Sequence, residues 1–470
     1  MITMLNRRPK LGLLGLMTGG YEDTFPGILA RQEKYAGELV KTMSQVADVT
    51  FAGIGTDRAK IEEIVKSYNE AELDGMVIVL LAYSQSMYLL RALENNRLPI
   101  ALAVVQPDQV VGDDWFELDL TVNQGIHGAQ DNANMIVRSG FKCEFFAGNR
   151  TEQRFVDFIN DFGKACYART VMKNMRVGVF SRMCGMGDIL TDDRAFTHKI
   201  GPEICHDTVG SMVSRMNEVT DAEVKAQMEL DYERFDVDPK LSRESHEIAI
   251  REYLGFKKFL EDMNYEAFTA HFDQFAADGR VRQLPLYGAS NLMAEGYGYA
   301  AEGDFACASM VRVAHAIGDG TAMGNFTEMY TMDFEKQAII FCHAGEANWK
   351  TARTDMKVRL IDRYLGEGGL ENPPTHIFTP QYGPSTLTSL ASIGGDKFRL
   401  VVAKGEMLPK SDMQNCEMPY FFWRPDSGMT NCVENWLRNG GTHHEVINLG
   451  DVSRRWKMLC NMLDIEYVEA

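Results

Sequence analysis

Two glutamates and two histidines in the C-terminal half of the chain could together form a reactive centre. Glu302 follows a stretch rich in glycine and tyrosine, and Glu328 lies between two aromatic residues. His343 ends an apolar run, and the pair His443 and His444 follows two glycines. Carboxylate and imidazole groups can hold a divalent metal ion, and the carboxylates can also move protons beside it.

Each of these side chains alone also has an ordinary structural explanation. Glu302 could begin a helix and interact with its macrodipole, Glu328 could be an exposed strand residue, and His343 could be a hydrogen-bonded core histidine. The histidine pair could lie in a simple loop. If it lies on a strand, the two rings point to opposite faces, and only one of them can be a ligand. The joint pattern therefore indicates a site more strongly than any member does.

The composition is that of a soluble globular protein with two or three domains. The chain has 470 residues, of which 45% are hydrophobic and 24% charged. A net charge of −18 disfavours nucleic acid and anionic membranes as partners, although a local basic pocket could still accept a small anion. No segment approaches the roughly 18–20 consecutive apolar residues of a membrane-spanning helix.

The cysteines and the N-terminus favour a reducing cytoplasm. There are nine cysteines, an odd number, and they are scattered without a Cys-x-x-Cys motif. A disulfide framework or a zinc-thiolate site is therefore not expected. The first apolar run, Leu11–Met17, is too short for the core of a signal peptide and is interpreted as a strand.

The first 172 residues alternate strand and helix patterns and predict an α/β domain. The expected strands are Leu11–Met17, Val49–Ile54, Gly75–Leu81 and Ile100–Val105, and the helices between them are Glu22–Met43, Arg58–Glu72 and Ser84–Asn95. This order predicts a parallel sheet with helices on both faces. Ligands of such sheets bind beyond the carboxyl ends of the strands. Two loops fall there, one with Thr18 and Gly19 and one with Tyr83. Gly19 and Gly20 are a weak phosphate-loop signal, and a plain turn is favoured.

The remainder predicts a second α/β domain over residues 173–325 and a mostly β domain over residues 326–470. A helix at Thr151–Asn174 precedes the strand Arg176–Ser181, a long helical region is expected at Glu247–Phe272, and another helix at Cys307–Ile317. Beyond Phe326, short apolar runs alternate with turns, which is typical of an antiparallel, barrel-like unit. These runs are Ala338–Cys342, Val358–Ile361, His376–Phe378, Phe398–Ala403, Tyr420–Trp423 and Glu445–Leu449.

Several short segments, taken in order along the chain, resemble the L-arabinose isomerase family and, more distantly, the L-fucose isomerases. The family's Gly-x-Gly-Ala-Glu-Gly-Asp is similar to residues 298–304, its Phe-Met-Glu-Asp-Tyr-Thr to residues 326–331, and its Gly-x-His-Met-x-Glu to the segment ending at residue 346. Its Gly-x-His-His-Thr-Val is similar to residues 441–446, and its Asn-Gln-x-x-His-Gly to residues 123–128.

The resemblance implies a fold and a set of roles. The fold would be an N-terminal flavodoxin-like domain, a second α/β domain and a C-terminal β-barrel. The metal ligands would be Glu302, Glu328, His343 and the second histidine of the pair, His444. Gln124 and His127 would complete the substrate pocket of a neighbouring subunit in a homo-oligomer. The other residues implied at the sugar site are Tyr83 and Met186, and the loop at Thr18 and Gly19 replaces the family's Gly-Ser-Gln.

These residues lead to the hypothesis of a metal-dependent aldose–ketose isomerase that acts on a monosaccharide through a cis-enediol. Glu302 and Glu328 would transfer the proton between adjacent carbons, and either could serve as acid or base. Oxygen and imidazole ligands favour Mn²⁺, with Mg²⁺ or Co²⁺ as alternatives.

The sugar itself is left open, because residues around the expected metal shell depart from the family pattern. Ala344 and Gly345 replace a bulkier pair, and Met329 replaces an aspartate. Pentoses, 6-deoxyhexoses, hexoses and acidic sugars all stay candidates. Two other functions are weighed against the isomerase: a non-enzymatic sugar-binding protein, and a metal-dependent epimerase or hydrolase.

Overall fold

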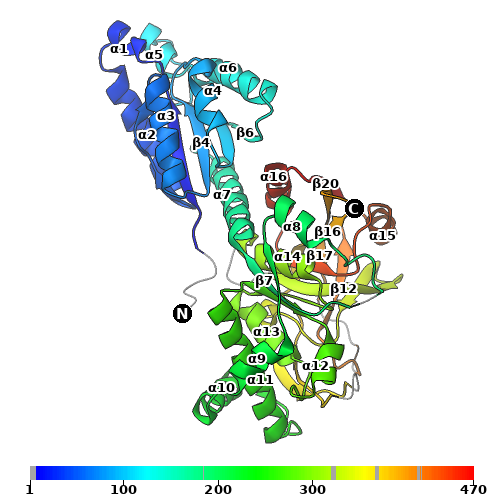
Figure 1. Cartoon of the computed structure of the whole chain (residues 1–470). Coiled ribbons are helices and arrows are strands. Elements are labelled where there is room, and N and C mark those ends of the chain that lie inside the picture. Colours follow the sequence, from blue (N-terminus) through cyan, green and yellow to red (C-terminus); the bar gives the residue numbers. More distant parts are fainter. Residues whose placement is uncertain (1–6, 184, 319–323, 366–369, 410–412, 414) are drawn as a thin grey trace. The chain divides into compact units, whose positions relative to one another are not determined.

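A computed structural model describes residues 7–183, 185–318, 324–365, 370–409, 413 and 415–470 (Figure 1). One of the nine cysteines, Cys184, is not among the described residues. The described part of the chain divides into two compact units, one over residues 7–170 and one over residues 171–470. The first boundary lies near the predicted residue 172, and the division of the second unit at residue 325 stays a prediction. No helix among the described residues is long and apolar enough to cross a membrane.

The first unit is a parallel sheet with helices around it. The sheet has the order β2-β1-β4-β5-β6, and β3 pairs with β1. Its strands are β1 (Lys10–Leu16), β2 (Asp48–Thr50), β3 (Ile54–Gly55), β4 (Gly75–Leu80), β5 (Ile100–Val104) and β6 (Cys143–Ala147). Its helices are α1 (Gly20–Thr24), α2 (Ile28–Met43), α3 (Arg58–Glu70), α4 (Ser86–Glu94), α5 (Glu117–Val122) and α6 (Gly125–Arg138), followed by α7 (Gln153–Asn174).

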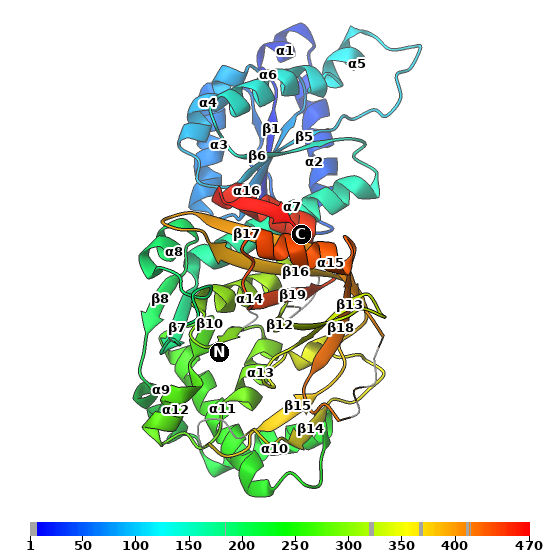
Figure 2. The same cartoon turned by 90° about the vertical axis from the view of Figure 1, so that its right-hand side faces the viewer.

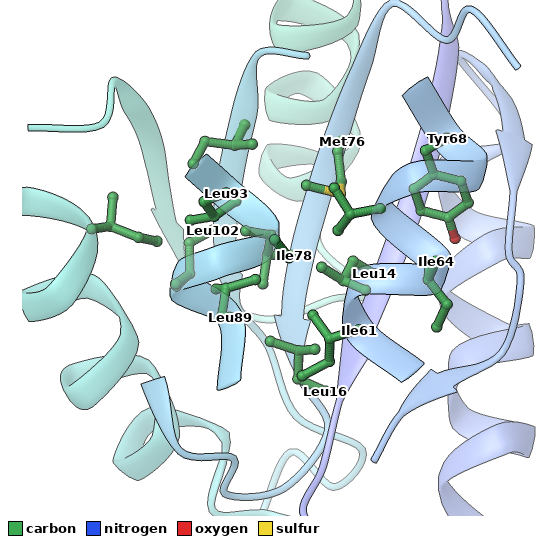
Figure 3. Packing of buried hydrophobic residues seen from close by; sticks show 14 of the residues in the cluster. Leu14, Leu16, Ile61, Ile64, Tyr68, Met76, Ile78, Leu89, Leu93 and Leu102 are labelled. Atoms are coloured by element: carbon green, nitrogen blue, oxygen red, sulfur yellow. The ribbon is translucent and has the colours of Figure 1, made fainter. Parts of the chain in front are cut away.

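Figure 3 shows how buried side chains of the sheet pack against its helices. Leu14 of β1, Ile78 of β4 and Leu102 of β5 point toward α3 and α4, where Ile64 and Leu89 meet them. The strand β4 is buried along its whole length, which is the pattern of a parallel strand covered on both faces. Each fully buried aliphatic side chain stabilises the unit by roughly 1.5–3 kcal/mol. The predicted parallel α/β architecture is therefore confirmed.

Two predicted elements of this unit are divided in the structure. The expected helix Glu22–Met43 is two helices, because Pro26 lacks an amide proton and Gly27 takes a left-handed φ of 93°. The expected strand Val49–Ile54 is the pair β2 and β3, interrupted at Gly53 with a φ of 104°.

The second unit begins with a parallel sheet in the order β11-β10-β7-β8. Its strands are β7 (Arg176–Phe180), β8 (Glu203–His206), β10 (Ala267–Ala270) and β11 (Gly298–Ala301). The helices are α8 (Asp193–Lys199), α9 (Val209–Met216), α10 (Asp221–Arg234), α11 (Arg243–Met263), α12 (Phe272–Asp278), α13 (Leu286–Glu295) and α14 (Phe305–Ile317). The predicted helix Glu247–Phe272 is wrong beyond Met263: Asn264 ends α11 in the left-handed region, and β10 follows.

The C-terminal part contains a closed antiparallel barrel of six strands. The order is β16-β19-β12-β13-β18-β17, and β17 pairs back with β16 to close it. The strands are β12 (Gly324–Asp333), β13 (Ala338–Cys342), β16 (Gly383–Ser392), β17 (Phe398–Met407), β18 (Tyr420–Pro425) and β19 (Glu445–Leu449). This confirms the predicted barrel-like unit. The C-terminal part also contains the 3₁₀ helix η1 (Trp349–Thr351), the helices α15 (Met429–Arg438) and α16 (Ser453–Leu463), and the strand β20 (Glu466–Glu469), which pairs with β17.

Two of the predicted short strands do not belong to the barrel. β14 (Arg359–Asp362) and β15 (Pro374–Ile377) form a separate three-stranded sheet with β9 (Asp236–Val237). The long strand β16, by contrast, was not predicted, because its sequence is rich in serine and threonine and lacks an apolar run.

Helix α14 joins the parallel sheet to the barrel. It packs against β10 and β11 of the parallel sheet and against β12 and β19 of the barrel. Figure 2 labels α14 close to β10 and β19. All of its residues are buried, which explains its sequence of alanines and branched apolar residues. Gly298 of β11 lets this helix approach, since a Cβ there would collide with the backbone oxygen of Ala308.

This close approach leads to a stability prediction. Gly298→Ala should lower the free energy of unfolding by about 1–3 kcal/mol, because the added methyl group overpacks the contact between β11 and α14. Gly37→Ala is the control: it lies inside α2, and a Cβ at this position would meet no atom within 4 Å, so it should not destabilise the chain. Thermal unfolding followed by circular dichroism measures both, and equal stability of the two variants would contradict this packing.

Candidate metal centre

The strained end of β11 places Glu302. This residue has a φ of 64°, rare for a side chain with a Cβ, and Gly303 follows with a φ of 87°. The backbone is held by the Glu302 amide, which donates to the Ala270 carbonyl at 2.8 Å, and by the Met183 amide, which donates to the Glu302 carbonyl at 2.9 Å. Strain of this kind costs roughly 1–3 kcal/mol and gathers at functional sites. The carboxylate thus stands at the carboxyl end of a parallel strand.

The barrel supplies Glu328 and His343 from neighbouring strands. Glu328 on β12 is paired in register with Cys342 on β13, and His343 follows β13 directly. The His343 Nε2 atom lies 3.3 Å from the Glu328 Oε1 atom. Strand register alone therefore brings these two side chains together.

The histidine pair lies in a bend before β19, not on a strand. The condition under which the two rings would point to opposite faces is therefore not met, and both rings approach Glu302. His444 is completely buried, and its Nε2 atom lies 3.5 Å from Glu302 Oε2 and 3.3 Å from Glu328 Oε1. His443 is more exposed: its Nε2 lies 3.7 Å from Glu302 Oε2, and its Nδ1 contacts Asp188 at 2.7 Å.

The donor atoms suit a divalent cation. Two overlapping triads, Glu302 with His443 and His444 and Glu328 with His343 and His444, each place their ligand atoms within 4.8 Å of one another. In the described part of the chain, the buried Oε2 of Glu302 and the buried Nε2 of His444 have no hydrogen-bond partner. Buried polar atoms that face one another without a partner are costly unless an ion or water satisfies them. The assignment of the four predicted ligands stays a prediction that this geometry supports.

Two buried carboxylates orient the imidazoles from behind. Asp304 lies 3.0 Å from Nδ1 of His444 and also caps α14 through the Cys307 amide. Glu346 lies 2.9 Å from Nδ1 of His343 and accepts a hydrogen bond from the Tyr299 hydroxyl at 2.8 Å. Such partners fix the orientation of an imidazole through Nδ1, so that Nε2 of each ring would be the nitrogen available to hold a metal. The sequence signal for both was their place in the two motifs, at two and three residues after a predicted ligand.

The electrostatics of the cluster favour ion pairs when no metal is bound. Burial alone would raise the pKa of the Glu302 carboxyl, but the imidazoles of His443 and His444 outweigh it and hold this pKa well below its ordinary value. Burial would lower the pKa of His444, but Asp304, Glu302 and Glu328 raise it well above the ordinary value. For His343, Glu346 likewise outweighs burial and raises the pKa. A cation must displace these imidazole protons, so its affinity falls as the pH falls.

A cavity of about 380 Å³ opens beside these side chains. Polar residues line part of it, among them Glu302, Glu328 and His343. Met186, predicted to contact the substrate, also lines it, and so does Met183 of the same loop. The volume falls within the range of roughly 300–1,000 Å³ that is usual for small-molecule sites.

The other predicted substrate residues gather in the first unit. The Thr18 amide donates to the Tyr83 carbonyl at 2.9 Å, and the rings of Tyr83 and His127 are 4.7 Å apart. Nδ1 of His127 lies 3.3 Å from Oε1 of Gln124. The Gly19 amide donates to the Thr56 carbonyl at 2.9 Å. These five residues thus form one cluster at the carboxyl ends of β1 and β4, in a different unit from the metal centre.

The chain matches two domain models of one family. The L-arabinose isomerase central domain matches residues 189–320, and the L-arabinose isomerase C-terminal domain matches residues 323–466. Together they cover more than half of the chain.

Individual relatives agree with these matches over nearly the whole length. The L-arabinose isomerase of Leuconostoc mesenteroides is 24% identical, covering 94% of this chain and 95% of the relative. The L-arabinose isomerase of Pediococcus pentosaceus is 26% identical, covering 93% and 94%. Among solved structures, a periplasmic solute binding protein from Actinobacillus succinogenes with bound D-allose is 9% identical over 58% of this chain and 84% of that chain, but its TM-score of 0.17 is too low to indicate a shared fold.

These matches define an aldose–ketose isomerase, an intramolecular oxidoreductase. The chain belongs to the L-arabinose isomerase family, of which it is a distant member.

The two histidines of the pair should differ in metal binding. His444→Gln should weaken Mn²⁺ binding by more than about 100-fold, because outer-shell partners alone are worth roughly 10–100-fold and His444 is the imidazole shared by both triads. His443→Gln, the matched control, should weaken it by less than about tenfold. Equilibrium dialysis with elemental analysis measures both constants. Equal losses would show that both histidines are ligands or that neither is.

Proposed function

We propose that this isomerase depends on a divalent metal ion and interconverts an aldose and its ketose through a cis-enediol. The observation that supports this most directly is the approach of two carboxylates, Glu302 and Glu328, to one buried nitrogen, Nε2 of His444, at 3.5 and 3.3 Å. Isomerisation moves one proton between adjacent carbons and another between their oxygens. Two carboxylates at one point can perform both the removal and the return of the carbon-bound proton.

The residues that would hold the metal are Glu302, Glu328, His343 and His444. Their oxygen and imidazole donors, without a thiolate, suit Mn²⁺ best, with Mg²⁺ or Co²⁺ as alternatives. When bound, such a cation polarises the sugar carbonyl and lowers the cost of negative charge on its oxygen.

The chain's own residues would carry the proton. The imidazoles keep Glu302 in its ionised form, which is the form that can accept a proton from carbon. Glu328 approaches the same nitrogen of His444 with its Oε1 atom at 3.3 Å, and its carboxyl group would exchange a proton with the adjacent carbon. The buried partners Asp304 and Glu346 keep the rings in place during this exchange.

The cluster of the first unit has a place in the same proposal. Gln124, His127, Tyr83, Thr18 and Gly19 would complete the sugar pocket of a neighbouring subunit in a homo-oligomer. The support is that these polar groups converge at the strand ends of the first unit, where ligands of parallel sheets bind.

The location of the enzyme would be the cytoplasm. The eight described cysteines are all free thiols, which supports a reducing compartment.

The proton-transfer roles can be tested by removing one carboxylate charge at a time. Glu302→Gln and Glu328→Gln should each lower turnover by about 10²–10⁴-fold, the usual worth of a general acid or base. Glu335→Gln, an exposed residue in the turn after β12, is the matched control and should keep full activity. Product formation is followed by NMR in D₂O, where the wild type should also introduce deuterium at carbon 2 of the aldose. Near-normal turnover of either active-site variant would refute the assignment.

The shared pocket can be tested by mixing subunits. Glu328→Gln and the double variant Gln124→Ala/His127→Ala should each be nearly inactive alone. Co-expressed in equal amounts, they should recover about one quarter of wild-type activity, because a quarter of the pockets in a randomly mixed oligomer combine two intact halves. If each pocket is built within one chain, no intact pocket can form, and the mixture stays inactive.

A further inference from the structure

A second cluster of buried titratable side chains lies among α10, α11, α13 and β15. Its members are Asp231, His246, Tyr287 and His376, each with at most 1% of its surface exposed. Nε2 of His246 lies 2.8 Å from Oδ2 of Asp231, and the Tyr287 hydroxyl donates to the same oxygen at 2.5 Å. Asp231 therefore ties α11 and α13 to α10. The proposed reaction uses none of these four groups.

His376 differs from the other three members because its ring is held by packing alone. Both of its ring nitrogens are buried and without a hydrogen-bond partner among the described residues. Its neighbours are aromatic: Tyr287 stacks on it with 5.3 Å between ring centroids, Trp349 stacks at 6.5 Å, and Phe235 meets it edge-on at 4.8 Å. A neutral imidazole leaves one N–H unpaired in these surroundings, and an imidazolium leaves two.

The groups that face His376 favour its neutral form. They are Asp231 of α10, His246 of α11 and Tyr287 of α13, and Leu360 of β14 is paired with it in the sheet. Burial is the largest influence and lowers the pKa of His376 from its ordinary value of 6.5 to about 4, although Asp231 acts in the opposite direction. Attraction to the aromatic faces offsets only part of the cost of burying a charge whose N–H groups have no acceptor.

His315 shows by contrast how a buried histidine is satisfied in the same unit. Its Nδ1 accepts from the Gly324 amide at 3.0 Å, and its Nε2 lies 3.2 Å from the Tyr297 carbonyl oxygen. It belongs to α14, which packs against both the parallel sheet and the barrel. His376 belongs to β15, a strand of four residues in the small sheet with β14 and β9. An element with so few neighbours opens at a lower cost than a central one.

Helix α13 connects the cluster to the metal centre. It packs against β15 and η1, and it carries Tyr287. Its Ser290 hydroxyl accepts from the Ala347 amide at 3.1 Å. Ala347 directly follows Glu346, the carboxylate that lies 2.9 Å from Nδ1 of His343. A displacement of α13 would therefore reach the segment that orients a predicted metal ligand.

We propose that His376 is an acid-sensitive switch: a proton on its ring opens the contact between β15 and α13 and releases the segment that carries Glu346. The switch lies within the second unit and requires no neighbouring subunit. It does not rest on the proposed function, because it concerns the opening of the fold and not the reaction.

The direction and size of the effect follow from the two states of His376. The ring binds a proton less readily in the folded chain than in the opened one, where its pKa returns to 6.5. Stability against opening is therefore complete above pH 6.5, falls as the pH drops below that value, and stops falling below about pH 4. Between pH 8 and pH 5 the constant for opening should rise by roughly 30-fold.

Amide hydrogen exchange followed by mass spectrometry measures the opening of individual elements. The full chain is compared at pH 8 and pH 5 with excess Mn²⁺, after correction for the intrinsic pH dependence of exchange. In the wild type, the opening constants of β15, α13 and residues 344–349 should rise together by roughly 30-fold. Peptides from β4 of the first unit are the internal reference and should not change. An equal rise in α14 would show that the second unit opens as a whole, and it would overturn the proposal.

Two variants isolate the ring of His376. His376→Phe keeps an aromatic side chain in the stack but cannot take up a proton, so β15 and α13 should lose the 30-fold rise. His198→Gln removes an exposed histidine of α8 and is the matched control, which should behave as the wild type. The titration of His315 and of the metal centre is common to all three proteins and cancels in the comparison.

The same pH dependence in His376→Phe as in the wild type would overturn the proposal. If His376→Phe does not fold, the wild type decides by itself: full protection of β15 and α13 at pH 5 overturns the switch, and a loss confined to these elements and residues 344–349 supports it.

Discussion

The site depends on one constraint: two carboxylates must approach a single buried imidazole nitrogen from two different sheets. Glu302 lies at the end of a strand of the parallel sheet, and Glu328 lies on a strand of the barrel. His444, in the bend before β19, contacts both of them through Nε2. Two carboxylates that approach the same nitrogen repel each other unless a proton or a cation lies between them. The imidazole protons meet this need, and a bound metal ion would meet it instead. Helix α14 is therefore buried on all sides, since it holds the two sheets in the register that the cluster requires.

The backbone at Glu302 is the second consequence of that constraint. In a regular strand, successive side chains point to alternate faces of the sheet, and a glutamate at its end would follow this pattern. Here a left-handed φ at Glu302, followed by one at Gly303, turns the chain sharply instead. Gly303 cannot carry a side chain there, because a Cβ would collide with the backbone of Ser181 and Arg182. The packing of β10, β11 and α14 offsets this backbone strain. The sharp turn also explains why glycine and aspartate follow Glu302: Gly303 makes the turn, and Asp304 caps α14 and orients His444.

The predictions from sequence succeeded where local pattern decides and failed where it does not. Gly75–Leu80 and Ala338–Cys342 were found because unbroken apolar runs of that length form buried strands. β16 was missed because serine and threonine dominate it, although it closes the barrel through β17 and β19. The helix predicted across Asn264 failed for the opposite reason: aromatic residues on both sides of a left-handed asparagine looked continuous, although one group belongs to α11 and the other to β10. Asp304 and Glu346 stand within the motifs, but their role is visible only once the rings they orient are placed.

By itself, the sequence determined most of the alternation of strands and helices, the presence of an antiparallel unit in the C-terminal part, and the kinds of side chain available for chemistry. These depend on periodicity and composition over a few neighbouring residues. Only the tertiary structure decided that His444 contacts both glutamates while His443 is held by Asp188, and that β14 and β15 leave the barrel. The physical reason is that such facts follow from strand register, barrel closure and one strained turn, and the contacts at the site join residues far apart in the sequence, such as Glu328 and His444 or Asp188 and His443.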